Sequence, residues 1–66
     1  MYAIRHKKTN KWLYGTDYRE QPYKQRTSYD MALTFEDKDE AEWEFKKRRC
    51  SKDFEIVKVR LEIVGD

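Results

Sequence analysis

The feature that most restricts the fold of this chain is an alternation of apolar and charged residues near its C-terminal end. The segment FEIVKVRLEIV, residues 54–64, places one apolar side chain at every second position, namely Val57, Val59, Leu61 and Ile63. A period of two residues puts these side chains on one face of a β-strand. We therefore expect a long final strand whose apolar face meets a helix and whose charged face meets solvent or a second chain.

A β-hairpin is predicted at the other end of the chain. Residues 2–6 (YAIRH) alternate between two faces, and residues 12–15 (WLYG) are aromatic and favour the β conformation. The polar run KKTNK at 7–11 supplies a loop of three to five residues, in which Asn10 suits a position with positive φ. Gly15 is expected to end the second strand.

The middle of the chain predicts a third strand followed by a helix. Residues 31–35 (MALTF) alternate, and residues 36–50 (EDKDEAEWEFKKRRC) place Ala41 and Phe45 on one helical face. Asp37 is suited to cap this helix, with a glutamate three residues later that would complete a capping box. The apolar stripe is narrow, so the helix covers one face of a sheet and shows its other side to water.

The predicted order is β-β-β-α-β, with residues 16–28 as a connection between the second and third strands. This order indicates an α+β fold: a small, mostly antiparallel β-sheet of about four strands with one helix packed on one face. Residues 1–66 form a single small domain, because a chain of 66 residues supports only one small core.

Such small domains often need a staple, and the usual ones are missing from this sequence. Cys50 is the only cysteine and His6 the only histidine, which excludes an intramolecular disulfide and a Cys/His zinc site. A homodimer formed edge to edge through residues 54–64 is one alternative, and a well-packed monomer is the other. The unpaired cysteine and the lack of a long apolar segment favour the cytoplasm, without membrane attachment.

The residues do not form an enzyme's pattern. The two glycines, at positions 15 and 65, make no phosphate-binding loop, and no nucleophile stands at a suggestive spacing from a base. The carboxylates of residues 36–44 are explained by the start of the helix, where its dipole favours negative charge. We expect a non-enzymatic protein without cofactor or metal.

Charge and aromatic residues are distributed unevenly. Residues 1–29 contain seven Lys or Arg against two acidic residues, a net charge of +5, while residues 30–66 contain eight against eleven, a net charge of −3. The basic half also holds all five tyrosines, four of them within residues 14–30. Tyrosine and arginine are typical of protein interfaces and of surfaces that bind single-stranded nucleic acid.

Three interpretations of this half stay open. Its tyrosines cover the sheet, or they bind a protein, or they bind nucleic acid. A protein partner, such as a host or phage protein, is favoured over nucleic acid because the positive excess is modest. The candidate partner-binding residues are Trp12, Tyr14, Tyr18, Arg19, Tyr23, Lys24, Arg26 and Trp43. The alternative, a nucleic-acid-binding surface, would use Lys7, Lys8, Lys11, Lys24 and Arg26.

Two features of the predicted helix also allow more than one interpretation. Trp43 lies off the apolar stripe, so it either packs at the flank against the hairpin or the connection, or stands exposed as an anchor for a partner. The run KKRR at 46–49 suggests a nucleic-acid patch, yet the helix dipole and i,i+4 pairs with glutamates favour a solvated, self-paired face. Cys50 is expected to be a small buried group near the helix end.

Nearly the whole chain resembles a family of small proteins from temperate phages of Gram-positive bacteria. The resemblance rests on YAIRHKKTNKWLYGTDYR, on QRTSYDMALTFEDKDEAEWEFKKRRC and on FEIVKVRLEIV. The recurrent elements are a KKT-x-K-W/Y hairpin, a GTDYR segment, an ALTF strand before an acidic helix start, and a closing EIVKV strand. The family has no assigned activity, so the resemblance implies a setting: a bacterial cytoplasm, where small phage proteins often bind host proteins or nucleic-acid complexes and some inhibit host defence.

Overall fold

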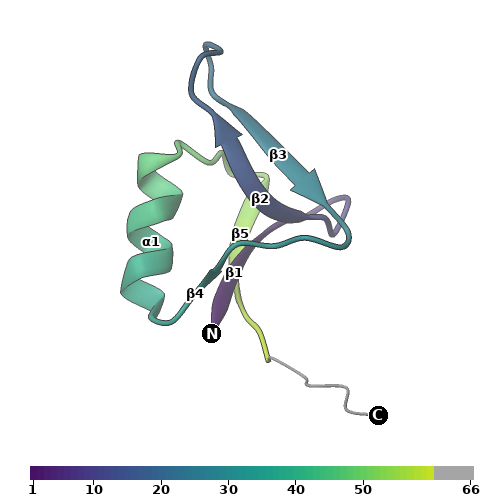
Figure 1. The fold of residues 1–66 in the computed structure, drawn as a ribbon, viewed down its shortest axis with the longest axis vertical. Coiled ribbons are helices and arrows are strands. Elements are labelled where there is room, and N and C mark those ends of the chain that lie inside the picture. Colours follow the sequence, from purple (N-terminus) through teal and green to yellow (C-terminus); the bar gives the residue numbers. More distant parts are fainter. Residues whose placement is uncertain (61–66) are drawn as a thin grey trace.

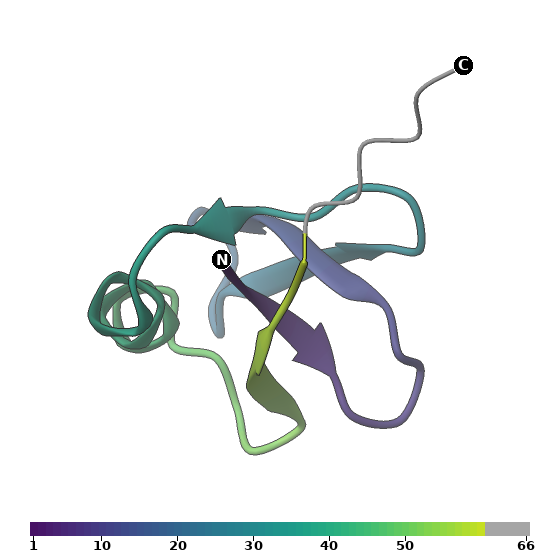
Figure 2. The ribbon, with the colours of Figure 1, turned by 90° about the horizontal axis from the view of Figure 1, so that it is seen from below.

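A computed structural model describes residues 1–60 as one five-stranded sheet and one helix (Figure 1). The elements in chain order are β1 (Tyr2–His6), β2 (Trp12–Asp17), β3 (Lys24–Ser28), β4 (Thr34–Phe35), α1 (Lys38–Lys47) and β5 (Phe54–Lys58). The predicted class, a small α+β fold with a mostly antiparallel sheet and one helix, is confirmed. The helix lies to one side of the strands (Figure 2).

Strand β1 is the centre of the sheet. It pairs antiparallel with β5 over its whole length, from Tyr2 opposite Lys58 to His6 opposite Phe54. Its other edge is divided between β2 and β4, which also run antiparallel to it. β3 pairs only with β2, so the order along the main path is β3-β2-β1-β4. No strand among residues 1–60 pairs with the outer edge of β5, and the edge-to-edge homodimer stays a prediction.

The core is small and lies between α1 and the sheet. Its buried cluster consists of Ile4, Leu13, Phe35 and Ala41, and half-buried apolar side chains, among them Phe45, pack around it. Ala41 and Phe45 therefore share the buried face of α1 as predicted. Complete burial of a side chain such as leucine or isoleucine contributes about 1.5–3 kcal/mol, so each of the few fully buried side chains matters to stability.

The face of the final strand that meets the core is not the predicted one but the other one. Phe54 and Ile56 pack on the core cluster, and Ile56 lies opposite the fully buried Ile4. Val57 lies opposite Ala3 and points to the other side of the sheet. The register with β1 decides this, because a shift of one residue exchanges the two faces of a strand. The observed strand ends at Lys58, so Val59 and Arg60 of the predicted strand are not part of it, and residues 61–64 lie outside the described residues.

The predicted connection at 16–28 is wrong, because most of it is strand. β2 continues past Gly15 to Asp17, and β3 pairs with it through residue 28. A bulge accommodates the extra residue Tyr14, since Leu13 lies opposite Thr27 while Gly15 lies opposite Arg26. The segment KQRTS of β3 contains no apolar residue, so it carries no alternation from which a strand could be predicted.

The other element boundaries differ in detail. Asn10 adopts the predicted positive φ, at 61°. Asp37 occupies the N-cap position, but its side chain makes no capping hydrogen bond, so the predicted capping box is absent. The third predicted strand is shorter, since only Thr34–Phe35 pairs with β1. α1 spans ten residues of the predicted fifteen. In the described part of the chain, no helix has the length and apolar character needed to cross a bilayer.

The C-terminal end of α1 is closed by a Schellman motif with an unusual residue. The amide of Cys50 donates to the carbonyl of Phe45, and the amide of Arg49 donates to that of Lys46. Arg49 adopts the left-handed conformation, with φ of 52°. This position usually holds glycine, and a residue with a Cβ costs about 1 kcal/mol there. Arginine at this site is therefore not the choice that stability alone would favour.

Because the core is small, we expect the removal of a single core side chain to lower the free energy of unfolding strongly. Leu13→Ala leaves a cavity beside Ile4 and is expected to lower the free energy of unfolding by about 3 kcal/mol. Met31→Ala, at a side chain that is 54% exposed, is the matched control and is expected to change it by less than about 0.5 kcal/mol. Urea unfolding followed by circular dichroism measures both. Equal effects of the two substitutions would contradict the assigned core.

Candidate functional site

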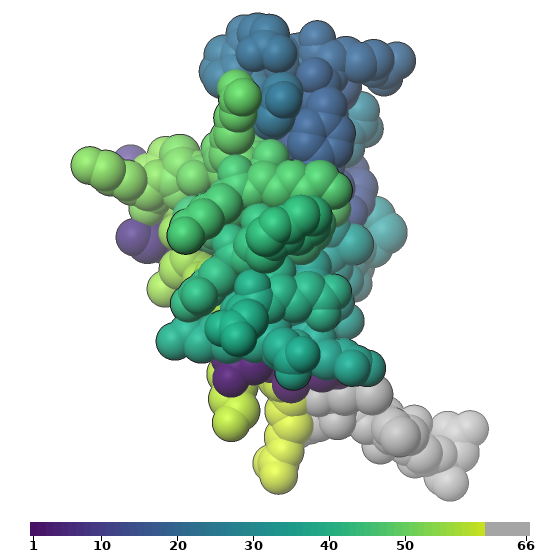
Figure 3. All heavy atoms as spheres, turned by 90° about the vertical axis from the view of Figure 1, so that its left-hand side faces the viewer, coloured from purple at the N-terminus to yellow at the C-terminus, as the bar shows by residue number. Residues whose placement is uncertain are grey.

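The predicted site lies on a projecting β-hairpin, residues 12–28, which we call the hairpin arm (Figure 1). Its inner face carries Leu13, Thr16, Gln25 and Thr27, and its outer face carries Trp12, Tyr14, Asp17, Lys24 and Arg26. Leu13 is the only residue of the arm in the buried core cluster. The bulge at Tyr14 keeps Leu13 and Thr16 on the same face, although they are three positions apart. The tip of the arm stands beyond the C-terminal end of α1 (Figure 3).

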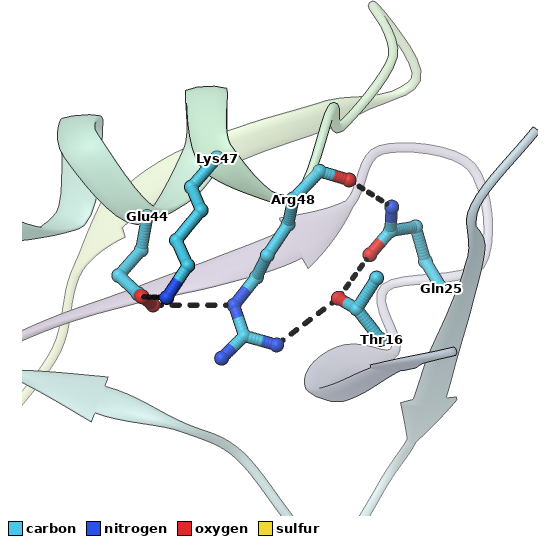
Figure 4. Close-up of polar contacts among 5 residues, drawn as sticks. All are labelled: Thr16, Gln25, Glu44, Lys47 and Arg48. Carbon is cyan, nitrogen blue, oxygen red and sulfur yellow. Dashed lines mark hydrogen bonds and ion pairs between the residues drawn. The ribbon is translucent and has the colours of Figure 1, made fainter. Parts of the chain in front are cut away.

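A polar cluster around Arg48 joins the inner face of the arm to α1 (Figure 4). The Arg48 guanidinium lies 3.3 Å from a Glu44 carboxylate oxygen and donates to Thr16 Oγ1 at 3.0 Å. Gln25 Nε2 donates to the Arg48 carbonyl at 2.6 Å, and Thr16 Oγ1 donates to Gln25 Oε1 at 2.6 Å. These four residues, which we call the Arg48 clasp, hold the arm by hydrogen bonds at a point where the core does not reach.

The Arg48 clasp changes the interpretation of the basic run at 46–49. The predicted i,i+4 pair between Glu44 and Arg48 is present, but Arg48 is not solvated: its side chain is only 16% exposed. Lys47 lies on the more exposed side of the same carboxylate, at 4.0 Å. Sequence reasoning missed the role of Thr16 and Gln25, whose polar side chains in a predicted loop gave no signal of a partner.

The outer face of the arm forms an open depression of about 610 Å³. Asp17 lines this depression and is paired with Arg19 at 3.4 Å and with Arg26 at 3.5 Å. The backbone amide of Arg19 donates to Asp17 Oδ1 at 3.0 Å. This bond, followed by the two guanidinium charges, holds the pKa of Asp17 below its ordinary value. The depression thus combines fixed positive and negative groups, with Tyr14 and Glu20 also in its lining.

Two tyrosines meet at the tip of the arm. The rings of Tyr18 and Tyr23 are edge to face, with centroids 5.0 Å apart and an interplanar angle of 79°. The Arg49 guanidinium lies over the Tyr23 ring at 4.8 Å. The contacts of the two rings restrict their orientation. Tyr18 is still 42% exposed, so its ring remains accessible to a partner.

Six of the eight predicted partner-binding residues lie together on the arm beyond its base; Trp12 lies at the base of the arm, and Trp43 lies on α1. Those on its distal half are Tyr14, Tyr18, Arg19, Tyr23, Lys24 and Arg26. Trp12 lies at the base of the arm, where the Arg5 guanidinium is 5.7 Å from its ring. Trp43 projects from the face of α1 opposite Ala41, is 61% exposed and contacts Lys47 at 5.0 Å. It does not pack at the flank against the arm, and exposure is the alternative that holds.

The five residues of the predicted nucleic-acid surface are divided between two places. Lys7, Lys8 and Lys11 lie in the turn between β1 and β2, and Lys11 contacts the ring of Tyr29 at 5.2 Å. Lys24 and Arg26 lie toward the tip of the arm, since Asp17 pairs with Lys24 while Trp12 pairs with Ser28 at the base. The hairpin arm therefore separates the turn lysines from the other two.

The cysteine and the acidic residues of the described chain lie as follows. Cys50 is half-buried beside the core, as predicted, and burial raises the pKa of its thiol to about 11, which keeps it protonated. Within residues 1–60, no three His, Cys, Asp or Glu side chains gather as a metal site would require. Comparison with protein-family models, with curated proteins and with solved structures finds no match to this chain.

The Arg48 clasp predicts that the arm can be loosened without unfolding the core. Arg48→Met keeps the aliphatic stem but removes the bonds to Thr16 and Glu44. Charge-assisted bonds of this kind contribute about 1.5–3 kcal/mol, so amides of residues 24–26 should lose at least about tenfold in protection from hydrogen exchange. Amides of β1 should change much less. Lys47→Met removes the more exposed cation and is the matched control; equal deprotection by both variants would argue against the clasp.

The pKa of Asp17 predicts a pH dependence of stability. A carboxyl whose pKa is depressed in the folded state stabilises the fold above its unfolded pKa, and the contribution is lost as pH falls through the folded pKa. Asp17→Asn should therefore lower the urea midpoint at about pH 7, and the difference from the wild type should be smaller at about pH 2. Urea titrations of both proteins at the two pH values measure this. A gap that persists at low pH would assign the effect to something other than charge.

Proposed function

We propose that this protein is a non-enzymatic interaction module that docks on another protein through the outer face and tip of its hairpin arm. The partner is a host or phage protein of the bacterial cytoplasm, the setting that the sequence resemblance implies. The docking surface consists of Tyr14, Asp17, Tyr18, Arg19, Lys24 and Arg26.

The observation that carries this proposal is the position of Asp17 between two arginines. A surface for nucleic acid gains affinity from cations that neutralise phosphates. Here the Asp17 carboxylate is already paired with Arg19 and Arg26, and its negative charge would repel a phosphate backbone. A protein partner, in contrast, can match positive and negative groups at once, and such complementarity favours specific pairing.

The aromatic residues of the tip support the same conclusion. Tyrosine and arginine are enriched among the residues that dominate binding energy at protein interfaces. The edge-to-face contact between Tyr18 and Tyr23 limits their rotamers before binding, which reduces the entropy lost when a partner covers them. The arm is attached to the body through Leu13 and the Arg48 clasp, so the surface is held in place.

The proposal is tested by a Tyr18→Ala, Arg19→Ala double variant. Tagged wild-type protein captures a partner from a lysate of a Gram-positive bacterium, the partner is produced separately, and calorimetry measures both affinities. The double variant should bind at least about tenfold more weakly, since interface tyrosines and arginines commonly contribute more than about 1.4 kcal/mol.

Tyr29→Ala is the matched control, because Tyr29 is 64% exposed and is outside the proposed docking surface. It should bind like the wild type. Equal affinity of the double variant and the wild type would refute docking through the tip.

Nucleic-acid binding is the second candidate, and the turn lysines favour it. Lys7, Lys8 and Lys11 form no ion pair within residues 1–60. Such binding would weaken steeply with salt, by about 0.7 in log affinity per log salt for each phosphate contact on a single strand. A gel shift with single- and double-stranded DNA and RNA at low salt should show no complex at micromolar protein. A salt-sensitive shift that Lys7→Ala, Lys8→Ala abolishes would favour this second function instead.

A further inference from the structure

A second concavity lies on the inner side of the hairpin arm and shares only Gln25 and Thr27 with the lining of the first. It is an open groove of about 420 Å³ between β3 and the segment that links α1 to β5. Its wall includes His6, Pro22, Tyr23, Arg49, Ser51 and Phe54, and we call it the inner groove. Residues from four separate parts of the chain meet here, and the interactions already described use few of their polar groups.

Arg49 is the residue that makes the inner groove unusual. It occupies the left-handed position that normally holds glycine, so the chain keeps a strained backbone where a common substitution would relieve it. Its guanidinium carbon lies 4.8 Å from the centroid of the Tyr23 ring, a cation–π contact that favours this position of the side chain. Within residues 1–60, this guanidinium makes no hydrogen bond and no ion pair. Residues with a strained backbone cluster at binding sites, and the guanidinium of Arg49 can bond to a ligand.

His6 supplies a second donor to the same groove. Its Nδ1 accepts the backbone amides of Lys8 and Thr9, each at 3.3 Å. In the neutral imidazole, this arrangement places the proton on Nε2, so the free ring nitrogen is a donor. The ring is also fixed by an edge-to-face contact with Phe54, with centroids 5.0 Å apart. The groove thus combines one guanidinium, one N–H donor and two aromatic walls.

The charges around the groove limit the ligand to a small anion. Glu44 engages Lys47 and Arg48, and Arg49 is the only cation in the groove lining. Asp53, whose carboxylate lies 3.5 Å from Ser51 Oγ, opposes an additional negative charge. The negative end of the α1 dipole is weakened, because the Schellman bonds and Gln25 occupy three of the last carbonyls. The single negative charge of one carboxylate matches the single positive charge of Arg49, whereas the several negative charges of a phosphate chain would exceed it.

We propose that the inner groove binds a single carboxylate side chain within an extended protein segment whose flanking residues are apolar. Arg49 takes the carboxylate in its planar fork, His6 Nε2 donates to it, and Tyr23 and Phe54 cover the flanking residues of the segment. The inference rests on the proposed function in taking a protein as the partner, but it concerns the opposite side of the arm.

Nuclear magnetic resonance of the isotope-labelled protein tests the inner groove directly. The probe is a five-residue peptide, blocked at both ends, with one glutamate between two leucines. Its controls are the same peptide with glutamine and inorganic phosphate. The Arg49 Nε–H and His6 ring signals should shift saturably with the glutamate peptide and at least tenfold more weakly with either control. Absence of a saturable shift, an equal response to the glutamine peptide, or tighter binding of phosphate would overturn the proposal.

Two substitutions separate binding from a structural role of Arg49. Arg49→Gly relieves the backbone, so it should raise the urea midpoint while weakening the peptide by more than tenfold. Arg49→Lys keeps the charge and the strain but loses the fork, and should also weaken the peptide severalfold. Lys52→Ala, at an exposed position outside the groove lining, should leave peptide affinity unchanged. A lower urea midpoint with unchanged peptide affinity for Arg49→Gly would make Arg49 a packing residue and refute the proposal.

The two proposals fail separately. Peptide binding that persists in the Tyr18→Ala, Arg19→Ala protein, combined with unaltered partner affinity of that variant, would retain the inner groove and remove the docking surface. Loss of partner affinity in that variant, with no peptide response in the wild type, would retain the docking surface and remove the groove.

Discussion

The rest of this structure depends on the burial of Ile4 and Leu13, the two largest side chains that are fully enclosed. Ile4 belongs to β1, which pairs with three other strands, and Leu13 brings the base of the hairpin arm into the same cluster. Because this core is so small, it cannot extend along the whole arm. The distal half is attached by polar contacts instead, and the Arg48 clasp is where that change occurs.

This division between an apolar body and a polar arm explains why both proposed sites lie where they do. Residues that need not fill a core are free to present charge and aromatic rings. The outer face of the arm combines Asp17 with two arginines. Its inner face carries Gln25 and Thr27, which meet Arg49 and His6 from other parts of the chain. The bulge at Tyr14 maintains these two faces, because it restores the alternation that an extra residue would otherwise reverse.

Arg49 illustrates a conflict between backbone stability and the binding role that we propose for it. A glycine at the end of α1 would suit the left-handed backbone better, yet the chain holds an arginine that stacks on Tyr23. Natural proteins sit only slightly above the stability that they need, so they retain such strain where a side chain is useful. In a domain with so few buried residues, a cost of about 1 kcal/mol is a substantial fraction of the total.

The sequence by itself determined the α+β class, the first hairpin with Asn10 at its turn, and the buried stripe of Ala41 and Phe45, because each follows from a local period or turn preference. It also identified the aromatic and basic residues of the arm, though not their arrangement. Only the tertiary structure decided that Ile56 rather than Val57 faces the core, since strand register depends on a distant partner. It also decided that the polar segment KQRTS is a strand, that Gln25 within it bonds to Arg48, and that Arg49 lies over the neighbouring Tyr23. Polar contacts between distant segments leave no periodic pattern in the sequence, because their specificity lies in geometry and not in hydrophobicity.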